Sequence, residues 1–172
     1  MLTLSLLRHA KSSWDDPSLE DFDRPLARRG IEAAGRMGRY IQAHDLAPAL
    51  IICSDAARAR QTLELVLPHL AAKPAVTYER GLYLASPQSM LARVRKLDAA
   101  DVRHVMLLGH DPGIHALAVD LAGTGEPRHL ASLARKFPTA ALAVIRFTVR
   151  DWAKAAPAKG KLMLFVAPKM LA

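Results

Sequence analysis

Short apolar runs alternate with longer segments of helical periodicity along most of this sequence. Apolar runs of strand length lie at 2–7, 50–54, 75–78 and 102–108. Segments in which apolar residues recur every three or four positions follow them, at 25–43, 57–70, 87–97 and 114–122. This alternation favours parallel strands joined by right-handed helical crossovers. We therefore expect an α/β fold, a three-layer sandwich with a mostly parallel central sheet.

The rest of the chain adds two strands and no boundary between domains. The strands are expected at 140–147 and 161–166, with an Ala/Lys/Pro-rich loop at 154–161 between them. A chain of 172 residues is long enough to bury a core without disulfides or metals. We expect one domain over residues 1–172. Asp23 is expected to cap the first helix, with Pro25 in its first turn.

The chain is basic, with 24 Lys and Arg against 16 Asp and Glu and a formal net charge of +8. Such an excess is typical of proteins that bind nucleic acid, an anionic membrane surface or a phosphate group. Aromatic residues make up 5% of the chain and form no stacking platform, so we expect no nucleic-acid partner. No apolar stretch approaches the roughly 20 residues that span a bilayer, so no membrane partner is expected.

Cysteine and histidine usage indicate a protein without metal, cofactor or disulfide. Cys53 is the single cysteine and lies in an apolar run, which predicts a buried, inert thiol. The apolar start of the chain is shorter than a signal peptide, and the expected location is cytoplasmic. His110 and His115 are five residues apart and have no evident third ligand, so no metal site is expected. No cofactor-binding motif occurs.

Basic side chains follow three of the predicted strands. Arg8 and His9 follow the first strand, Arg58 comes shortly after the second, and His110 follows the fourth. Ligands of open α/β sheets bind beyond the carboxyl ends of the strands, where these side chains converge. Arginine offers forked donors that suit phosphate oxygens, and a histidine among cations stays neutral and nucleophilic. The pattern predicts attack of an imidazole nitrogen on phosphorus.

The motifs that carry these residues resemble those of the histidine phosphatase superfamily. They occur in the family's order as Arg8-His-Ala-Lys11, Asp23-Arg-Pro-Leu26, Ser54-Asp-Ala-Ala-Arg58-Ala-Arg-Gln-Thr62-Leu-Glu64, Gly109-His-Asp-Pro-Gly113 and Phe137-Pro-Thr-Ala-Ala141. They are most similar to the SixA-type phosphohistidine phosphatases. The resemblance implies a phosphoglycerate mutase-like fold in a short form, without a large insertion over the site. It also implies a phosphatase that acts on a phosphohistidine-bearing protein.

The resemblance also implies roles for individual residues. His9 is the expected nucleophile, which becomes a phosphohistidine and is then freed by water. Arg8 and Arg58 are expected to hold the phosphoryl oxygens, and His110 is expected to be a further phosphate contact.

The resemblance indicates the roles of three residues near the nucleophile less specifically. Lys11 and Ser12 follow it and are candidate substrate-binding residues, although a solvated loop explains them equally well. Asp15 falls where mutase-branch relatives carry a neutral phosphate-pocket residue, so no role is transferred to it.

The general acid of the superfamily has no clear match. Glu79 matches it in one alignment, and a second alignment, which we favour, places Leu84 there and leaves no acid. An alkoxide leaving group needs a proton in the transition state, whereas a phosphoramidate such as phosphohistidine leaves more easily. This favours phosphohistidine as the substrate. Substitute acids on the loop before the first helix are Glu20, Asp21 and Asp23.

Two alternative functions remain open on the sequence. A mutase or small-molecule phosphatase of the same superfamily would act on a small phosphorylated substrate with Glu79 as its acid. A non-catalytic basic binding module would account for the charge alone.

Overall fold

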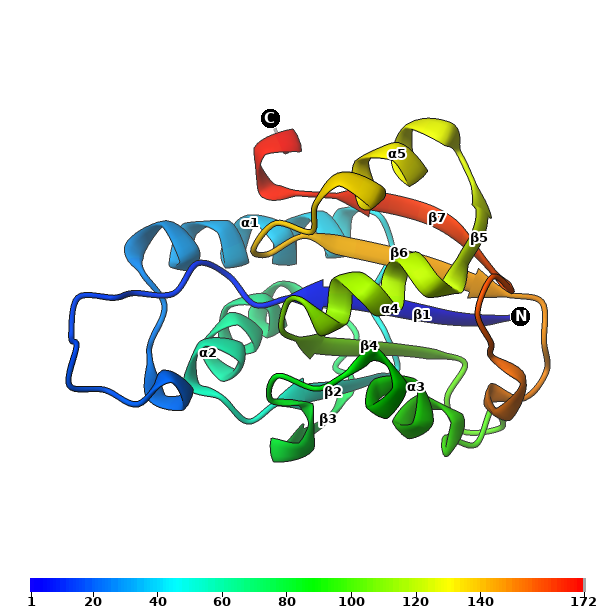
Figure 1. Cartoon of the computed structure of the whole chain (residues 1–172), viewed down its shortest axis with the longest axis horizontal. Helices are drawn as coiled ribbons and strands as arrows, with labels where there is room; N and C mark the ends of the chain where they lie inside the picture. Colours follow the sequence, from blue (N-terminus) through cyan, green and yellow to red (C-terminus); the bar gives the residue numbers. More distant parts are fainter. Residues whose placement is uncertain (172) are drawn as a thin grey trace.

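Seven strands form one sheet in a computed structural model, which describes residues 1–171 (Figure 1). In spatial order the strands are β3 (Ala75–Glu79), β2 (Leu50–Ser54), β4 (His104–Gly109), β1 (Leu2–Arg8), β6 (Leu142–Phe147), β7 (Gly160–Val166) and β5 (Ala122–Gly125). β3, β2, β4 and β1 pair in parallel, and β6 pairs antiparallel with β1 and β7. β6 is thus the one strand of the described sheet that runs against the others.

Helices cover both faces of this sheet and enclose two apolar clusters. Helices α1 (Arg28–Ala43) and α2 (Ala57–Val66) pack on one face, against a cluster that includes Leu7 and Ile51. Helices α3 (Pro87–Arg95), α4 (Gly113–Leu121) and α5 (Pro127–Arg135) pack on the other face. Alternate residues of β1 face opposite ways, so Leu4 and Leu6 belong to this second cluster. The three-layer arrangement expected from the sequence is confirmed.

Within residues 1–171, five short 3₁₀ helices lie between these elements or after β7. They are η1 (Asp21–Asp23), η2 (Leu67–His69), η3 (Arg80–Leu82), η4 (Trp152–Lys154) and η5 (Pro168–Met170). None of the helices within residues 1–171 has the length and apolar character needed to cross a membrane.

Two elements, β5 and α5, were not predicted. β5 has the sequence Ala-Gly-Thr-Gly, which shows no apolar alternation, and it exists by pairing in parallel with β7. α5 buries one residue, Leu133, with Leu130 partly buried, so its apolar pattern is short. Local periodicity is therefore a weak signal for either element.

The prediction that Asp23 caps the first helix is wrong. That helix begins at Arg28, and its N-cap residue, Ala27, makes no side-chain capping bond. The residues before it stay extended because they pair with the loop that follows β1. Ser12 and Leu26 form an isolated antiparallel bridge, and the Ala27 N–H donates to the Lys11 carbonyl over 2.9 Å.

Candidate active site

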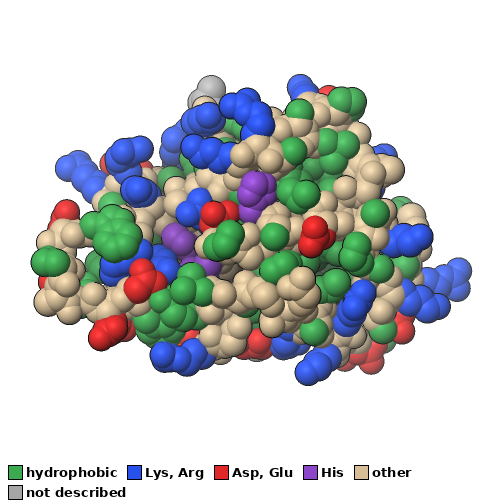
Figure 2. Space-filling view, viewed as in Figure 1, with side chains coloured by type: hydrophobic (Ala, Val, Ile, Leu, Met, Phe, Trp, Pro, Cys, Tyr) green, Lys and Arg blue, Asp and Glu red, His purple; other side chains and the backbone are tan. Residues whose placement is uncertain are grey.

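A pocket of about 240 Å³ lies at the carboxyl ends of β1, β2 and β4. Figure 2 shows histidine side chains beside Lys and Arg side chains on the face in view. The pocket is lined by Arg8, His9, Lys11, Ser12, Trp14, Arg24, Arg58, His110, Asp111 and Thr139. The pocket therefore brings together the predicted nucleophile, the three predicted phosphate contacts and both substrate-binding candidates of the sequence.

Backbone hydrogen bonds fix the nucleophile candidate at the end of β1. Arg8 pairs with Gly109 of β4, and the His9 N–H donates to the Gly109 carbonyl over 3.1 Å. The N–H of Ala140 donates to the Arg8 and His9 carbonyls over 3.1 and 3.0 Å. His9 and His110 thus leave adjacent strands side by side, with ring centroids 5.1 Å apart.

Thr62, which follows Arg58 by one helical turn, has a structural role in the site. Its hydroxyl donates to the Arg58 carbonyl over 2.7 Å and accepts from the Ala10 N–H over 2.9 Å. One buried side chain therefore ties α2 to the loop after β1. The neighbouring Gln61 accepts from the Leu26 N–H over 2.8 Å, which ties the same helix to the segment before α1.

The hydrogen bonds of His9 define its tautomer. Nδ1 lies 2.7 Å from the Ala10 carbonyl oxygen, an acceptor, so Nδ1 carries the proton. Nε2 is then the unprotonated nitrogen, and it accepts from Nε of Arg58 over 3.4 Å. The lone pair that a nucleophile needs is therefore on the nitrogen that faces the arginine.

His9 is neutral at physiological pH. Its side chain is 6% exposed, and this burial is the main cause that lowers its pKa to about 3. The hydrogen bond to Ala10 opposes the shift, and His110, Arg58 and Arg8 add to it. The neighbouring cations, from which the sequence predicts the neutral form, lower the pKa of His9 less than burial does.

A carboxylate outside the pocket lining holds Arg58. Nη1 of Arg58 donates to the Asp21 carbonyl over 2.7 Å, and Nη2 donates to its carboxylate over 3.1 Å. The Tyr83 hydroxyl and Arg24 donate to the same carboxylate. The hydrogen bond from Tyr83 is the largest cause that lowers the pKa of Asp21 to about 2. Asp21 is therefore ionised near pH 7 and cannot supply a proton there.

Arg24 organises the other wall of the pocket. Its Nη1 donates to the Ser12 hydroxyl over 2.8 Å and to the Ser13 carbonyl over 3.1 Å. Its guanidinium carbon lies 3.5 Å from the centroid of the exposed Trp14 ring. Ser12 is thus held in place by an arginine, whereas Lys11 is exposed at the pocket rim.

Two buried side-chain nitrogens of residues 1–171 have no hydrogen-bond partner, and both belong to pocket residues. They are Nε of Arg8 and Nδ1 of His110. The other nitrogen of His110, Nε2, lies 2.7 Å from the Ser54 hydroxyl, which accepts from the Ala56 N–H. When Ser54 donates to Nε2, Nδ1 carries a free N–H. Unpaired buried donors are rare in folded proteins and mark a place for an acceptor.

Burial also lowers the pKa of His110 and of Arg8. His110 is 2% exposed, and burial lowers its pKa to about 4, so it is neutral near pH 7. Burial also lowers the pKa of Arg8, and the carboxylate of Asp111 opposes this shift. Nη1 of Arg8 donates to the Phe137 carbonyl over 2.8 Å, which is how the late Phe-Pro-Thr segment reaches the site.

The structure does not bring Glu79 into the pocket. Its carboxylate pairs with Arg93 of α3 at distances of 2.8 to 3.1 Å. Leu84 is largely exposed and has a positive φ of 50°. The one carboxylate that lines the described pocket is Asp111. Glu20 and Asp23 do not line it either.

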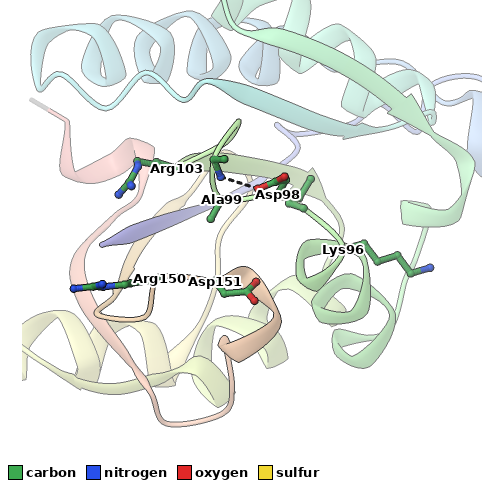
Figure 3. Close-up of a pocket in the computed structure, with 8 residues that line it drawn as sticks. Lys96, Asp98, Ala99, Arg103, Arg150 and Asp151 are labelled. Carbon is green, nitrogen blue, oxygen red and sulfur yellow. Dashed lines mark hydrogen bonds between the residues drawn. The ribbon is translucent and has the colours of Figure 1, made fainter.

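A larger hollow lies at the opposite end of the strands, beside the residues that precede β4 and those that follow β6, and its lining differs from that of the pocket (Figure 3). Its volume is about 610 Å³, and Lys96, Asp98, Arg103, Arg150 and Asp151 supply its charged lining. It contains no histidine or cysteine, and its two carboxylates accept from backbone N–H groups of Ala100 and Ala153. Within residues 1–171 no cluster of three or more His, Cys, Asp or Glu side chains could hold a metal ion.

Sequence reasoning missed the positioning residues of the site. The sequence motifs assign no role to Arg24 or to Tyr83. Asp21 was considered as an acid and not as an anchor. The spacing of Asp21 and Arg24, three residues apart in a loop, was the available signal for an ion pair.

Comparisons with known proteins agree with this geometry. A family model described as "Histidine phosphatase superfamily (branch 1)" matches residues 4–82. An uncharacterized protein of Mycobacterium tuberculosis is 36% identical over 165 residues, covering 95% of this chain and 100% of the relative.

Two solved structures assigned to the phosphohistidine phosphatase SixA are also similar. The structure from Agrobacterium tumefaciens has 30% sequence identity and a TM-score of 0.81, covering 97% of this chain and 98% of its own. The structure from Nakamurella multipartitia has 31% identity and a TM-score of 0.80, with coverages of 97% and 96%.

The chain belongs to the histidine phosphatase superfamily, in its SixA-type branch. The predicted fold is confirmed, including the short form: no large insertion covers the pocket within the described residues. Membership places the chain among the phosphatases.

Proposed function

We propose that this protein hydrolyses phosphohistidine on a protein substrate through a covalent intermediate on His9. In the first step, the Nε2 lone pair attacks phosphorus and the bond from phosphorus to the substrate imidazole breaks. The substrate imidazole takes a proton from water. In the second step, water attacks phosphorus, the bond to Nε2 breaks, and inorganic phosphate leaves with the remaining proton passing to solvent. His9 keeps its Nδ1 proton throughout.

The unpaired side-chain nitrogens of Arg8 and His110 are the observation that carries this proposal. Both are buried beside His9, and a phosphoryl oxygen satisfies donors of this kind. Arg58 supplies a third donor, whose Nε moves from Nε2 of His9 to a phosphoryl oxygen as the new bond forms. Fixed donors that face developing charge are an effective source of transition-state stabilisation.

The positions of the carboxylates predicted as acids favour a leaving group that needs no protonation by the protein. Of the acids predicted from the sequence, Glu79 is engaged with Arg93 and Asp21 is held ionised, so neither of these two is free to protonate an alkoxide. A phosphoramidate depends less on such an acid. The matched structures from Agrobacterium and Nakamurella carry the name of a phosphohistidine phosphatase, which supports the same substrate class.

Parallel assays with two donors test this function. We expect faster release of phosphate from a phosphohistidine-bearing phosphotransfer domain than from a sugar phosphate at equal concentration. The reverse preference would overturn the assignment of the substrate and favour a small-molecule phosphatase.

A further inference from the structure

A basic groove adjoins the catalytic pocket and plays no part in the chemistry described above. Its volume is about 420 Å³, and it shares Lys11 and Thr139 with the pocket lining. Besides Lys11, the exposed cations that line it are Arg29, Lys136 and Lys169. Figure 2 shows Lys and Arg side chains gathered over α1 and the C-terminal segment on the face in view.

Four separate parts of the chain build this groove. Lys11 lies in the loop after β1, Arg29 lies in the first turn of α1, Lys136 follows α5, and Lys169 lies in η5. Arg36 anchors the last of these, because its Nη2 donates to the Pro168 carbonyl over 3.0 Å. The charges therefore converge because the fold brings distant segments together.

Few carboxylates offset this charge. Glu32 is the one acidic residue of the described lining, and it lies 3.7 Å from Arg28 of its own helix. Within residues 1–171, the side chains of Arg29, Lys136 and Lys169 make no ion pair. The groove is thus a positive surface that begins where the catalytic pocket ends.

We propose that this groove binds the carboxylates of an acidic protein segment that flanks the phosphohistidine of the substrate. This inference rests on the proposed function and specifies its partner. A site for a second phosphate would be built from buried, forked donors, as the catalytic pocket is with Arg8 and Arg58. The groove instead spreads exposed cations over several elements, which suits an extended anion of low charge density. Such a surface guides association and adds specificity.

A pair of phosphohistidine peptides tests the groove. One peptide carries Asp and Glu on both sides of the phosphohistidine, and the other carries Asn and Gln at the same positions. We expect the protein to hydrolyse the acidic peptide with a kcat/KM about tenfold higher at low salt, with the difference shrinking as salt increases. Equal values for the two peptides would overturn the inference.

Charge-reversal variants locate the effect. The triple variant Arg29→Glu, Lys136→Glu, Lys169→Glu is expected to lose the preference for the acidic peptide and to hydrolyse small phosphoramidate as the unchanged protein does. The matched control is Lys96→Glu, Arg103→Glu, Arg150→Glu, which reverses three exposed cations in the hollow of Figure 3 and should keep the preference. Equal loss in both variants would show a general charge effect and overturn the inference.

Two further outcomes separate the proposals. Failure of the unchanged protein to hydrolyse phosphoramidate or either peptide would overturn the proposed function itself. Weaker inhibition by inorganic pyrophosphate in the groove variant, with the peptide preference intact, would show a small-molecule phosphate subsite and overturn the inference about an acidic protein.

Discussion

Nε of Arg58 lies 3.4 Å from Nε2 of His9, the ring nitrogen that the Ala10 carbonyl leaves without a proton. The nucleophile candidate and the cation that would hold the phosphoryl group are therefore in direct contact. Thr62 fixes the backbone on both sides of this contact, and Asp21 fixes the far end of the guanidinium.

Asp21 is expected to act by positioning Arg58. Asp21→Asn should lower kcat/KM about 10- to 100-fold, because a neutral amide holds the guanidinium less firmly. Tyr83→Phe, which removes one hydroxyl from the same carboxylate, should cost less. The measurement is kcat/KM on phosphomonoesters with leaving groups of different pKa. A positioning role predicts the same loss for all of them, and a loss that grows with leaving-group pKa would instead make Asp21 the acid.

The pH behaviour of the two pocket histidines follows from their burial. The pKa of His9 is lowered to about 3 and that of His110 to about 4, so both rings should stay neutral from pH 8 to pH 5. Histidine NMR spectra should show three rings without chemical-shift change over this range, because burial also lowers the pKa of His104 to about 4, and His9→Asn should remove one of the three. A His9 titration near pH 6.5 would contradict the account.

The same lowered pKa values affect stability. The unfolded chain takes up protons below pH 6.5 that the folded rings do not, so the free energy of unfolding should fall as pH decreases from 6.5 towards 4. Above pH 6.5 these groups should have no effect. Urea unfolding at pH 7 and pH 5 measures this difference.

Gly30 is expected to be intolerant of any side chain. A Cβ there would lie 2.1 Å from the Lys11 carbonyl oxygen, so Gly30→Ala must push α1 away from the loop after β1. We expect a loss of about 1–3 kcal/mol in the free energy of unfolding, typical of overpacking. Gly35 of the same helix is the matched control, because the nearest atom to its Cβ outside the helix backbone would be 3.7 Å away. Gly35→Ala should stabilise by up to about 1 kcal/mol through helix propensity.

Glu79 is expected to be dispensable for catalysis. Glu79→Gln should leave kcat/KM within about twofold on phosphohistidine and phosphomonoester substrates, because this partly exposed carboxylate pairs with Arg93. The thermal midpoint reports the small loss of that ion pair. A 100-fold or greater loss on phosphomonoesters alone would restore Glu79 as the acid of a small-molecule phosphatase.

The sequence predicts the parts of the site that depend on strand ends, and it misses those that depend on loops. His9 and His110 could be placed together because parallel strands align their carboxyl ends, whichever strands lie between them. Tyr83 could not be placed, because its approach to Asp21 depends on how the segment after β3 folds. Asp23 was misread as a helix cap because pairing of the preceding segment with the loop after β1 is a tertiary effect.

The same distinction applies to the fold. β1, β2 and β4 carry largely apolar runs because helices cover both faces, and these runs are visible in the sequence. β5 lies at the edge of the sheet and has no such run, so only its pairing with β7 defines it.

A covalent phosphoryl group on His9 is the central claim, and its direct test is a single turnover. Excess phosphohistidine-bearing phosphotransfer domain is mixed with the protein, the reaction is quenched in alkali to preserve phosphoramidate bonds, and the peptide containing His9 is analysed by mass spectrometry. We predict one phosphoryl group on His9 within the first turnover and none in His9→Asn. Phosphate release at the normal rate from His9→Asn, or without any label on His9, would contradict the account.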